Sequence, residues 1–286
     1  KRQGMDSIDR PSNYDRKFMG PITVKDALKY SRNLVAIRLI RSIGPELVVR
    51  YAHDLGVASP LLPVVSLALG SCEVNLLEMV SAAGTIANLG ERIEPIMIRK
   101  ITDKDGTLIE VNNALPERRL SAQTSYVMTD IMESVPNGGT GYHVREYYKG
   151  AAAGKTGTTN EQRDAWFNGF HPELVTTAWV GFDELLPLGR KETGGRAALP
   201  MWISLMKAAL AGKPERALVQ PDGMVTIKID PDTGLAILPG QPGGIAETFR
   251  KELVPKAADA NAGVSPDIFS GDGAPATDVE IREDLF

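Results

Sequence analysis

The hydrophobic period of this chain changes near Gly150, and that change restricts the fold more than any other feature. Before it, apolar residues recur at helical spacing, as in LLEMVSAAGTIANLG. After it, AAAGKTGTT, RDAWFNGF and TTAWVGFD are β-rich runs joined by short turns, which predicts consecutive antiparallel strands. We expect the apolar segment ALPMWISLMKAALAG to be a helix that packs across this sheet. The pattern therefore predicts an α+β chain, with a helical region at about 13–140 and a sheet with its packing helix at about 150–212.

Two shorter segments and a tail complete the outline. The run IMIRKITDKDGTLIEV has β-rich halves on either side of Asp105-Gly106, which favours a hairpin that projects as a small ribbon. The run MVTIKIDPDTG predicts one strand followed by a turn. Residues 251–286 are rich in Pro, Gly, Ala and Asp, and we expect this C-terminal tail to be weakly structured.

Composition argues against several classes of function. The net charge is -4, from 32 Lys and Arg against 36 Asp and Glu, so we expect no nucleic-acid partner. Three scattered His and one Cys have no zinc-ligand spacing, and we expect neither a metal nor a cofactor. Cys72 stands in an apolar run, where a small buried thiol is the expected state. Asp130 and Glu133 share a helix face without an accompanying groove, and we interpret this pair as solvated.

The segment KTGTT at 155–159 concentrates an ammonium, hydroxyls and a glycine that admits close backbone approach. A phosphate-binding P-loop needs four residues between its first glycine and GK[ST], whereas only three alanines separate Gly150 from Gly154. The sequence that follows also indicates a strand instead of the helix that a P-loop requires. A plain surface turn stays open from these residues alone. The remaining interpretation is the K-T-G element of serine acyl-transfer enzymes that bind penicillins.

Ser31-Arg32-Asn33 has the S-x-N form of a second element of those enzymes, at a junction between two predicted helices about 120 residues before Lys155. Taken alone, it is equally typical of a helix-capping Ser and Asn. The flanking segments are more specific. NYDRKFMGPITVKDALKYSRNLVAIRL, SLALGSCEVNLLEMVSAAGTIANLG, GKTGTTNEQRDAWFNGF and VTIKIDPDTG resemble, in family order over about residues 13–250, the transpeptidase domain of class A penicillin-binding proteins.

The resemblance implies the serine β-lactamase-like form of the α+β class, in which an antiparallel sheet packed with helices lies beside an all-helical region. The site would lie in the cleft between them. By the same resemblance, catalytic positions are matched by Ser31, Asn33 and Lys155, and substrate-binding positions by Thr156, Gly157 and Thr158.

Each matched residue has an implied role. Ser31 relays a proton, Asn33 binds a substrate amide and Lys155 keeps the network polarised. The hydroxyls of Thr156 and Thr158 hold the substrate carboxylate, while the backbone N–H of Thr158 contributes to the oxyanion hole. Gly157 leaves room for the acyl group.

The nucleophile of this family is the serine of an S-x-x-K element that precedes S-x-N, and no such element precedes Ser31. The only S-x-x-K here is the run SLMK at 204–207, after K-T-G, and we interpret Ser204 as part of an ordinary apolar helix. We therefore expect an incomplete fold, the C-terminal part of the transpeptidase domain at 1–250, inactive alone and partnered by the upstream segment of the same protein.

The implied activity is that of a peptidoglycan D,D-transpeptidase or carboxypeptidase of a bifunctional peptidoglycan synthase. Its substrates would be stem peptides, and β-lactams would be covalent inhibitors. Such a protein would act at the periplasmic face of the bacterial cytoplasmic membrane, held by an N-terminal anchor that this chain does not contain. An alternative from another class stays open, namely a non-catalytic module that recognises penicillin or a stem peptide. Intact S-x-N and K-T-G elements discriminate weakly between the two.

Overall fold

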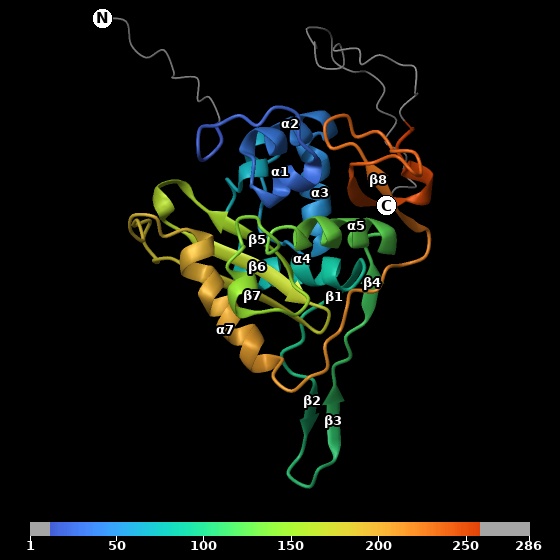
Figure 1. Ribbon diagram of the computed structural model, residues 1–286. Helices are drawn as coiled ribbons and strands as arrows, with labels where there is room; N and C mark the ends of the chain where they lie inside the picture. The colour runs from blue at the N-terminus through green and yellow to red at the C-terminus, as the bar shows by residue number, and fades with distance from the viewer. Residues whose placement is uncertain (1–11, 258–286) are drawn as a thin grey trace, which may run out of the picture.

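The computed structural model of the protein describes residues 12–257. Figure 1 shows a helical region above a small sheet, a long ribbon below it and a strand pair at one side. The helices are α1 (Val24–Lys29), α2 (Asn33–Ile43), α3 (Pro45–Leu55), α4 (Leu76–Ala87), α5 (Ala122–Glu133), α6 (Val144–Tyr147) and α7 (Leu199–Ala209). The strands are β1 (Glu91–Ile93), β2 (Lys100–Thr102), β3 (Leu108–Val111), β4 (Pro116–Arg118), β5 (Ala153–Thr158), β6 (Ala165–His171), β7 (Leu174–Val180), β8 (Met224–Ile229) and β9 (Ile245–Arg250).

Local sequence signals set the ends of several helices. Thr23 caps α1, where its hydroxyl accepts a hydrogen bond from the backbone N–H of Asp26. α3 begins at Pro45 and ends before Gly56, whose φ of 112° lies in the left-handed region that favours glycine. Ser121 caps α5 in the same way as Thr23 caps α1. The predicted helix junction at Ser31 is therefore real, because α1 ends at Lys29 and α2 begins at Asn33.

The central sheet has the order β5-β6-β7 and is antiparallel throughout, as the sequence predicts. β5 pairs with β6 in an unbroken register that sets Lys155 opposite Asn168 and Thr158 opposite Ala165. Among residues 12–257, β6 is the only strand paired with β5, so β5 forms an edge of this sheet. The K-T-G residues thus stand on an edge strand.

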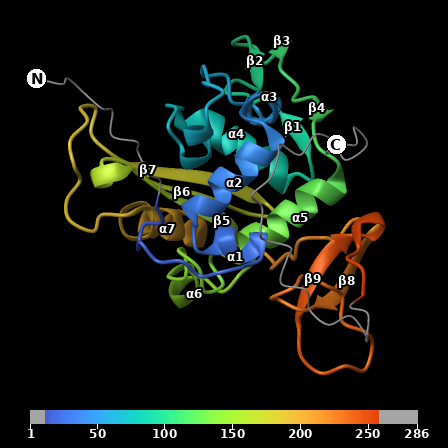
Figure 2. The same cartoon turned by 90° about the horizontal axis from the view of Figure 1, so that it is seen from above.

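Helices cover both faces of this sheet (Figure 2). Because side chains alternate along a strand, Phe167 and Phe170 of β6 point to opposite faces. Phe167 packs in a cluster with Trp202 of α7, and the two ring centroids are 5.1 Å apart. Phe170 packs in a second cluster with Met132 of α5. This sandwich of α7, sheet and helical region fixes β5 against the helices that carry the S-x-N residues.

Three strand pairs lie outside the central sheet. The predicted hairpin is β2 with β3, and Figure 1 shows it projecting from the body. Its turn contains Gly106, with a φ of 85°. β1 pairs with β4 near its base, and β8 pairs with β9. β1, β4 and β9 are not predicted from the sequence, because their short or polar runs carry no clear period of two.

Two expectations from the sequence are wrong. The carboxylate of Asp130 is not a freely solvated group, because its side chain is only 25% exposed and Lys25 Nζ donates to it at 2.8 Å. Glu133 is half-buried, and burial raises the pKa of its carboxyl, with the charge of Asp130 adding to the rise. Cys72 is only half-buried, and its sulfur accepts from the backbone N–H of Leu62 at 3.4 Å.

Residues 258–286 of the predicted weakly structured tail lie outside the described residues. Before them, the carbonyl of Lys256 accepts from the backbone N–H of Ala236 at 2.9 Å. Within the part of the chain that the structure describes, every helix is too short or too polar to cross a bilayer.

Candidate active site

Ser31 and Lys155 are 124 residues apart in the sequence, yet their side chains meet. Lys155 Nζ donates a hydrogen bond to Ser31 Oγ at 2.9 Å and a second to the carbonyl oxygen of Thr156, also at 2.9 Å. Ser31 comes from the junction of α1 and α2, whereas Lys155 comes from the edge strand β5. The structure thus joins one residue of S-x-N to one residue of K-T-G.

The backbone of Ser31 has a φ of 52°, in the left-handed region that non-glycine residues seldom adopt. Such a conformation costs about 1 kcal/mol or more and persists only where the surroundings hold it. Two backbone hydrogen bonds hold it here, from Ser31 N–H to Leu28 O at 3.1 Å and from Arg32 N–H to Ala27 O at 2.8 Å. The tight junction between the helices therefore fixes where Ser31 Oγ lies.

Lys155 carries its charge without a neutralising carboxylate. Burial lowers the pKa of its ammonium from 10.5 to about 8. Among residues 12–257, no Asp or Glu forms a salt bridge with it. An ammonium has three N–H donors, and two are used by Ser31 and Thr156. A ligand carboxylate at this place would supply the missing countercharge.

Two threonine hydroxyls of β5 are oriented by neighbouring loops. Thr156 Oγ1 and Thr140 Oγ1 are 2.7 Å apart and share a hydrogen bond. Thr158 Oγ1 accepts from the backbone N–H of Gly194 at 3.0 Å. Because this oxygen acts as an acceptor there, its own proton stays available to a ligand. Sequence reasoning missed Thr140 and Gly194, although the glycine-rich run PNGGTGYHV marks the first of these loops.

Gly157 lies where a side chain would crowd the neighbouring strand. A Cβ added to Gly157 would lie 3.0 Å from Trp166 Cβ. A Cβ on Gly194 would lie 2.4 Å from the carbonyl oxygen of Gly157 and 2.3 Å from that of Trp166. The steric constraint that the structure shows at Gly157 therefore comes from Trp166, and the space for an acyl group stays an expectation.

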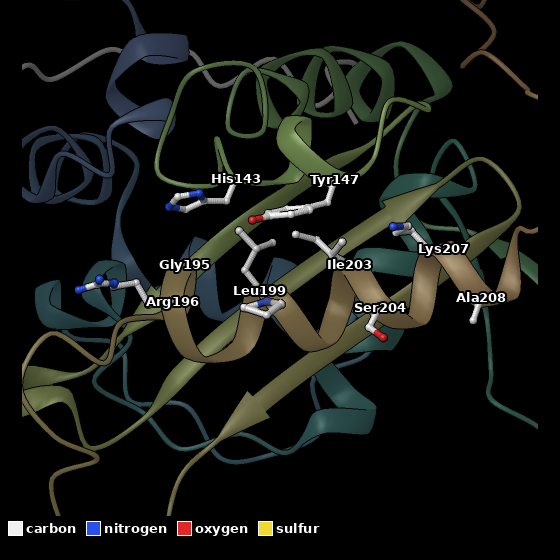
Figure 3. Close-up of a pocket in the computed structure, with 10 residues that line it drawn as sticks. His143, Tyr147, Gly195, Arg196, Leu199, Ile203, Ser204, Lys207 and Ala208 are labelled. Carbon is white, nitrogen blue, oxygen red and sulfur yellow. The ribbon is translucent and has the colours of Figure 1, made fainter.

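Asn33 is not joined to this constellation. It is the first residue of α2, and its side-chain amide donates to the carbonyl of Ser12 at 2.9 Å. Among the described residues it forms no hydrogen bond with the K-T-G strand. Ser204 and Lys207 lie on α7 and line a different cavity, together with His143 and Tyr147 (Figure 3). This cavity is lined by none of Ser31, Asn33, Lys155, Thr156 or Thr158, so Ser204 and Lys207 lie outside the S-x-N and K-T-G site.

Comparison with known sequences identifies a protein family for this chain. Residues 63–183 match the family described as "Penicillin binding protein transpeptidase domain". This match contains the K-T-G strand but not Ser31. Penicillin-binding protein 1A of Pseudomonas aeruginosa is 33% identical over 333 residues, covering 99% of this chain and 40% of that protein. Penicillin-binding protein 1A of Aquifex aeolicus is 38% identical and covers 77% of this chain and 30% of that protein.

Solved structures agree with the sequence matches. Penicillin-binding protein 1A of Haemophilus influenzae aligns with a TM-score of 0.82 at 29% identity, covering 89% of this chain and 44% of that one. PonA1 of Mycobacterium tuberculosis, in complex with penicillin V, aligns with a TM-score of 0.66 at 24% identity, covering 81% of this chain and 65% of that one, and supports the fold alone.

This chain spans 40% or less of the length of these two curated relatives. Over that span, its sequence and its α+β fold agree with one group of proteins. The chain belongs to the penicillin-binding protein transpeptidase family, in the class A branch that contains penicillin-binding protein 1A.

Proposed function

We propose that this chain forms the S-x-N and K-T-G side of a D,D-transpeptidase site that cross-links peptidoglycan by serine acyl-enzyme chemistry. One observation carries the proposal, the 2.9 Å hydrogen bond from Lys155 Nζ to Ser31 Oγ. If K-T-G were only a surface turn and S-x-N only a helix cap, no contact between Lys155 and Ser31, 124 residues apart, would be expected. Two polar groups brought together beside an edge strand are, in contrast, what an acyl-transfer site requires.

The nucleophilic serine comes from an upstream segment that this chain does not contain. This serine attacks the carbonyl carbon of a D-alanyl-D-alanine peptide bond, the C–N bond breaks, and D-alanine leaves with a proton on its nitrogen. The amine of a second stem peptide then attacks the resulting ester and releases the serine. Two facts support an upstream origin of the nucleophile. No S-x-x-K element precedes Ser31 in this chain, and Ser204, the serine of the S-x-x-K run at 204–207, lines a different cavity.

Ser31 donates the proton that the leaving nitrogen needs. Its Oγ already accepts a hydrogen bond from Lys155, so its own O–H is directed elsewhere and is free to donate. The left-handed backbone of Ser31 holds that hydroxyl in one place. Asn33 completes S-x-N by binding a substrate amide, which requires its side chain to leave the carbonyl of Ser12.

The K-T-G strand binds the end of the substrate. Lys155 neutralises the terminal carboxylate, and the hydroxyls of Thr156 and Thr158 hydrogen-bond to it. The free edge of β5 lets an extended peptide pair as an added strand, with Gly157 in the middle of that edge. The backbone N–H of Thr158 forms half of an oxyanion hole with that of the nucleophilic serine, and such a donor contributes about 3 to 4 kcal/mol.

The proposal extends to the whole protein. This chain alone is inactive, and its partner is the upstream segment with the S-x-x-K serine. β-Lactams acylate that serine because their ring carbonyl and carboxylate imitate the D-alanyl-D-alanine end. The complete protein, a bifunctional synthase, works at the periplasmic face of the cytoplasmic membrane, where peptidoglycan is cross-linked.

Intact-mass spectrometry after incubation with benzylpenicillin tests the proposal. The sample is the complete protein, followed by peptide mapping, with this 286-residue chain alone in parallel. We expect one drug mass on a serine upstream of this chain and none on the chain alone. The matched control, Ser204→Ala in the complete protein, should label like the wild type. Acylation of Ser204 would disprove the upstream nucleophile. A complete protein that binds stem peptide without being acylated would favour the non-catalytic module.

A further inference from the structure

A groove of about 760 Å³ runs along α7 on the side that faces α6. Leu199 and Ile203 of α7 form apolar walls, and His143 and Tyr147 stand opposite them (Figure 3). The volume lies within the range of pockets that hold a ligand or a short peptide segment. The proposed acyl-transfer chemistry does not use this groove, and nothing inferred about the groove depends on that chemistry.

The ends of the groove are cationic. Arg196 lies at one end and Lys207 at the other, and Figure 3 shows them on either side of the apolar residues. No Asp or Glu of the described part of the chain lines the groove. Within residues 12–257, neither Arg196 nor Lys207 forms a salt bridge. The carboxylate of Glu146 on α6 is occupied by His143 Nδ1, at 3.0 Å. The groove therefore suits an apolar segment that carries negative charges at its ends.

We propose that residues 278–286 of this same chain, the sequence DVEIREDLF, bind in this groove. Residues 258–286 contain seven carboxylate side chains against one arginine, which complements the cationic ends. Within the last nine residues, Ile281, Leu285 and Phe286 supply apolar side chains for the walls. Residues 278–286 thus combine the negative charges and the apolar side chains that suit the groove.

The spacing of the acidic residues in 278–286 matches the spacing of the two cationic residues of the groove. Arg196, in the short helical segment Gly194–Ala198 that leads into α7, is eleven positions before Lys207, which corresponds to about 16 Å at a helical rise of about 1.5 Å per residue. Asp278 and Glu283 are five residues apart, which is about 17 Å in an extended segment. Ile281 stands between them in the sequence, as Leu199 and Ile203 stand between Arg196 and Lys207.

The chain is long enough to reach the groove. Twenty-nine residues follow Ala257, with a contour length of about 95 Å. A domain of about 250 residues is roughly 45 Å across. The tail can therefore pass around the body from Ala257 to α7 within one molecule.

A photo-crosslinking experiment tests the proposal in the complete protein that carries this chain. A benzophenone amino acid replaces Ser204, which lines the groove, or Leu205, the next residue on α7, which is 52% exposed but does not line it. After illumination, peptide mapping by mass spectrometry identifies the partner peptide. We expect the Ser204 position to yield crosslinks to 278–286 and the Leu205 position to yield at least fivefold fewer.

Charge reversal and isotope mixing complete the test. Arg196→Glu with Lys207→Glu should reduce the tail crosslink at least fivefold, whereas Lys228→Glu, on β8 away from the groove, should leave it unchanged. Equal mixtures of ¹⁴N- and ¹⁵N-labelled protein should give crosslinks within one isotope only. The proposal is wrong if the Ser204 position captures a second copy, another protein or no tail peptide, or if charge reversal leaves the yield unchanged.

Discussion

Two half-buried lysines of this molecule have opposite surroundings. Lys25 of α1 donates to Asp130 of α5 at 2.8 Å and to Glu247 of β9 at 2.9 Å. Burial alone would lower the pKa of Lys25, but these two carboxylates outweigh it and raise the pKa. Lys155 has only a hydroxyl and a carbonyl as acceptors, and burial lowers its pKa to about 8.

The difference separates a structural lysine from a site lysine. Two carboxylates keep Lys25 charged, so that it joins α1, α5 and the β8–β9 pair. Lys155 holds a positive charge that its own chain leaves without a countercharge, at a cost in stability. A buried ammonium without a carboxylate partner is expected where a ligand supplies the opposite charge. Lysines with strongly perturbed pKa values cluster at functional sites for that reason.

The largest effect should come from removing the site lysine. We expect Lys155→Ala in the complete protein to lower the second-order rate constant of penicillin acylation by about 100-fold or more, because the carboxylate loses its countercharge and Ser31 its donor. Labelling with a fluorescent penicillin measures this rate constant. Lys25→Arg, which keeps the charge at the structural lysine, is the control and should react normally. Near-normal acylation of Lys155→Ala would remove Lys155 from the mechanism.

For the free energy of unfolding, the structural lysine should matter more than the site lysine. We expect Lys25→Met to destabilise the transpeptidase domain by about 2 kcal/mol, because Asp130 and Glu247 lose their shared cation in a partly exposed place. Lys155→Met should instead stabilise it by about 1 kcal/mol at pH 7, since the cost of burying the charge exceeds the two hydrogen bonds lost.

Urea unfolding of the complete domain at pH 7 measures both changes. The stability cost of charged Lys155 is present below pH 8 and disappears as the pH rises toward 10.5, because the unfolded state then binds more protons than the folded state. If Lys25→Met and Lys155→Met destabilise the domain to the same extent, the distinction between a structural lysine and a site lysine is wrong.

The pH dependence of acylation should report Lys155. We expect the second-order rate constant to fall above pH 8, by about tenfold for each further pH unit, because the deprotonated amine cannot neutralise the carboxylate. Lys155→Arg should abolish this fall, since a guanidinium stays charged, even where its rate is lower throughout. Lys25→Arg should keep the fall of the wild type. A rate that stays flat from pH 7 to pH 10 in the wild type would contradict the lowered pKa.

The smallest effect concerns two threonine hydroxyl pairs, one at the site and one between β8 and β9. Thr140→Val removes the partner of Thr156 Oγ1, and we expect about a threefold loss of acylation rate, the equivalent of one weak hydrogen bond. Thr226→Val removes a similar hydroxyl pair, with Thr248, between the exposed strands β8 and β9. It should leave acylation unchanged. Equal losses in the two variants would show that neither hydroxyl acts at the site.

Much of the fold could be predicted because local patterns decide it. The helix that begins at Pro45, the cap at Ser121 and the turn at Gly106 follow from side chains and backbone conformations within a few residues. The strands β1, β4 and β9 could not be predicted, because a short edge strand owes its pairing to its neighbours. The half-buried state of Cys72 likewise depends on the loop that contains Leu62.

The α+β order, the helix ends and the K-T-G and S-x-N elements, with the resemblance that they carry, follow from the amino-acid sequence. Which of these residues meet depends on how the chain folds in three dimensions. The fold brought Ser31 to Lys155, left Asn33 on the carbonyl of Ser12 and turned Asp130 from a solvated carboxylate into a partner of Lys25. The physical reason is that burial and charge at one residue depend on residues more than 100 positions away, as the separations of 124 and 105 show.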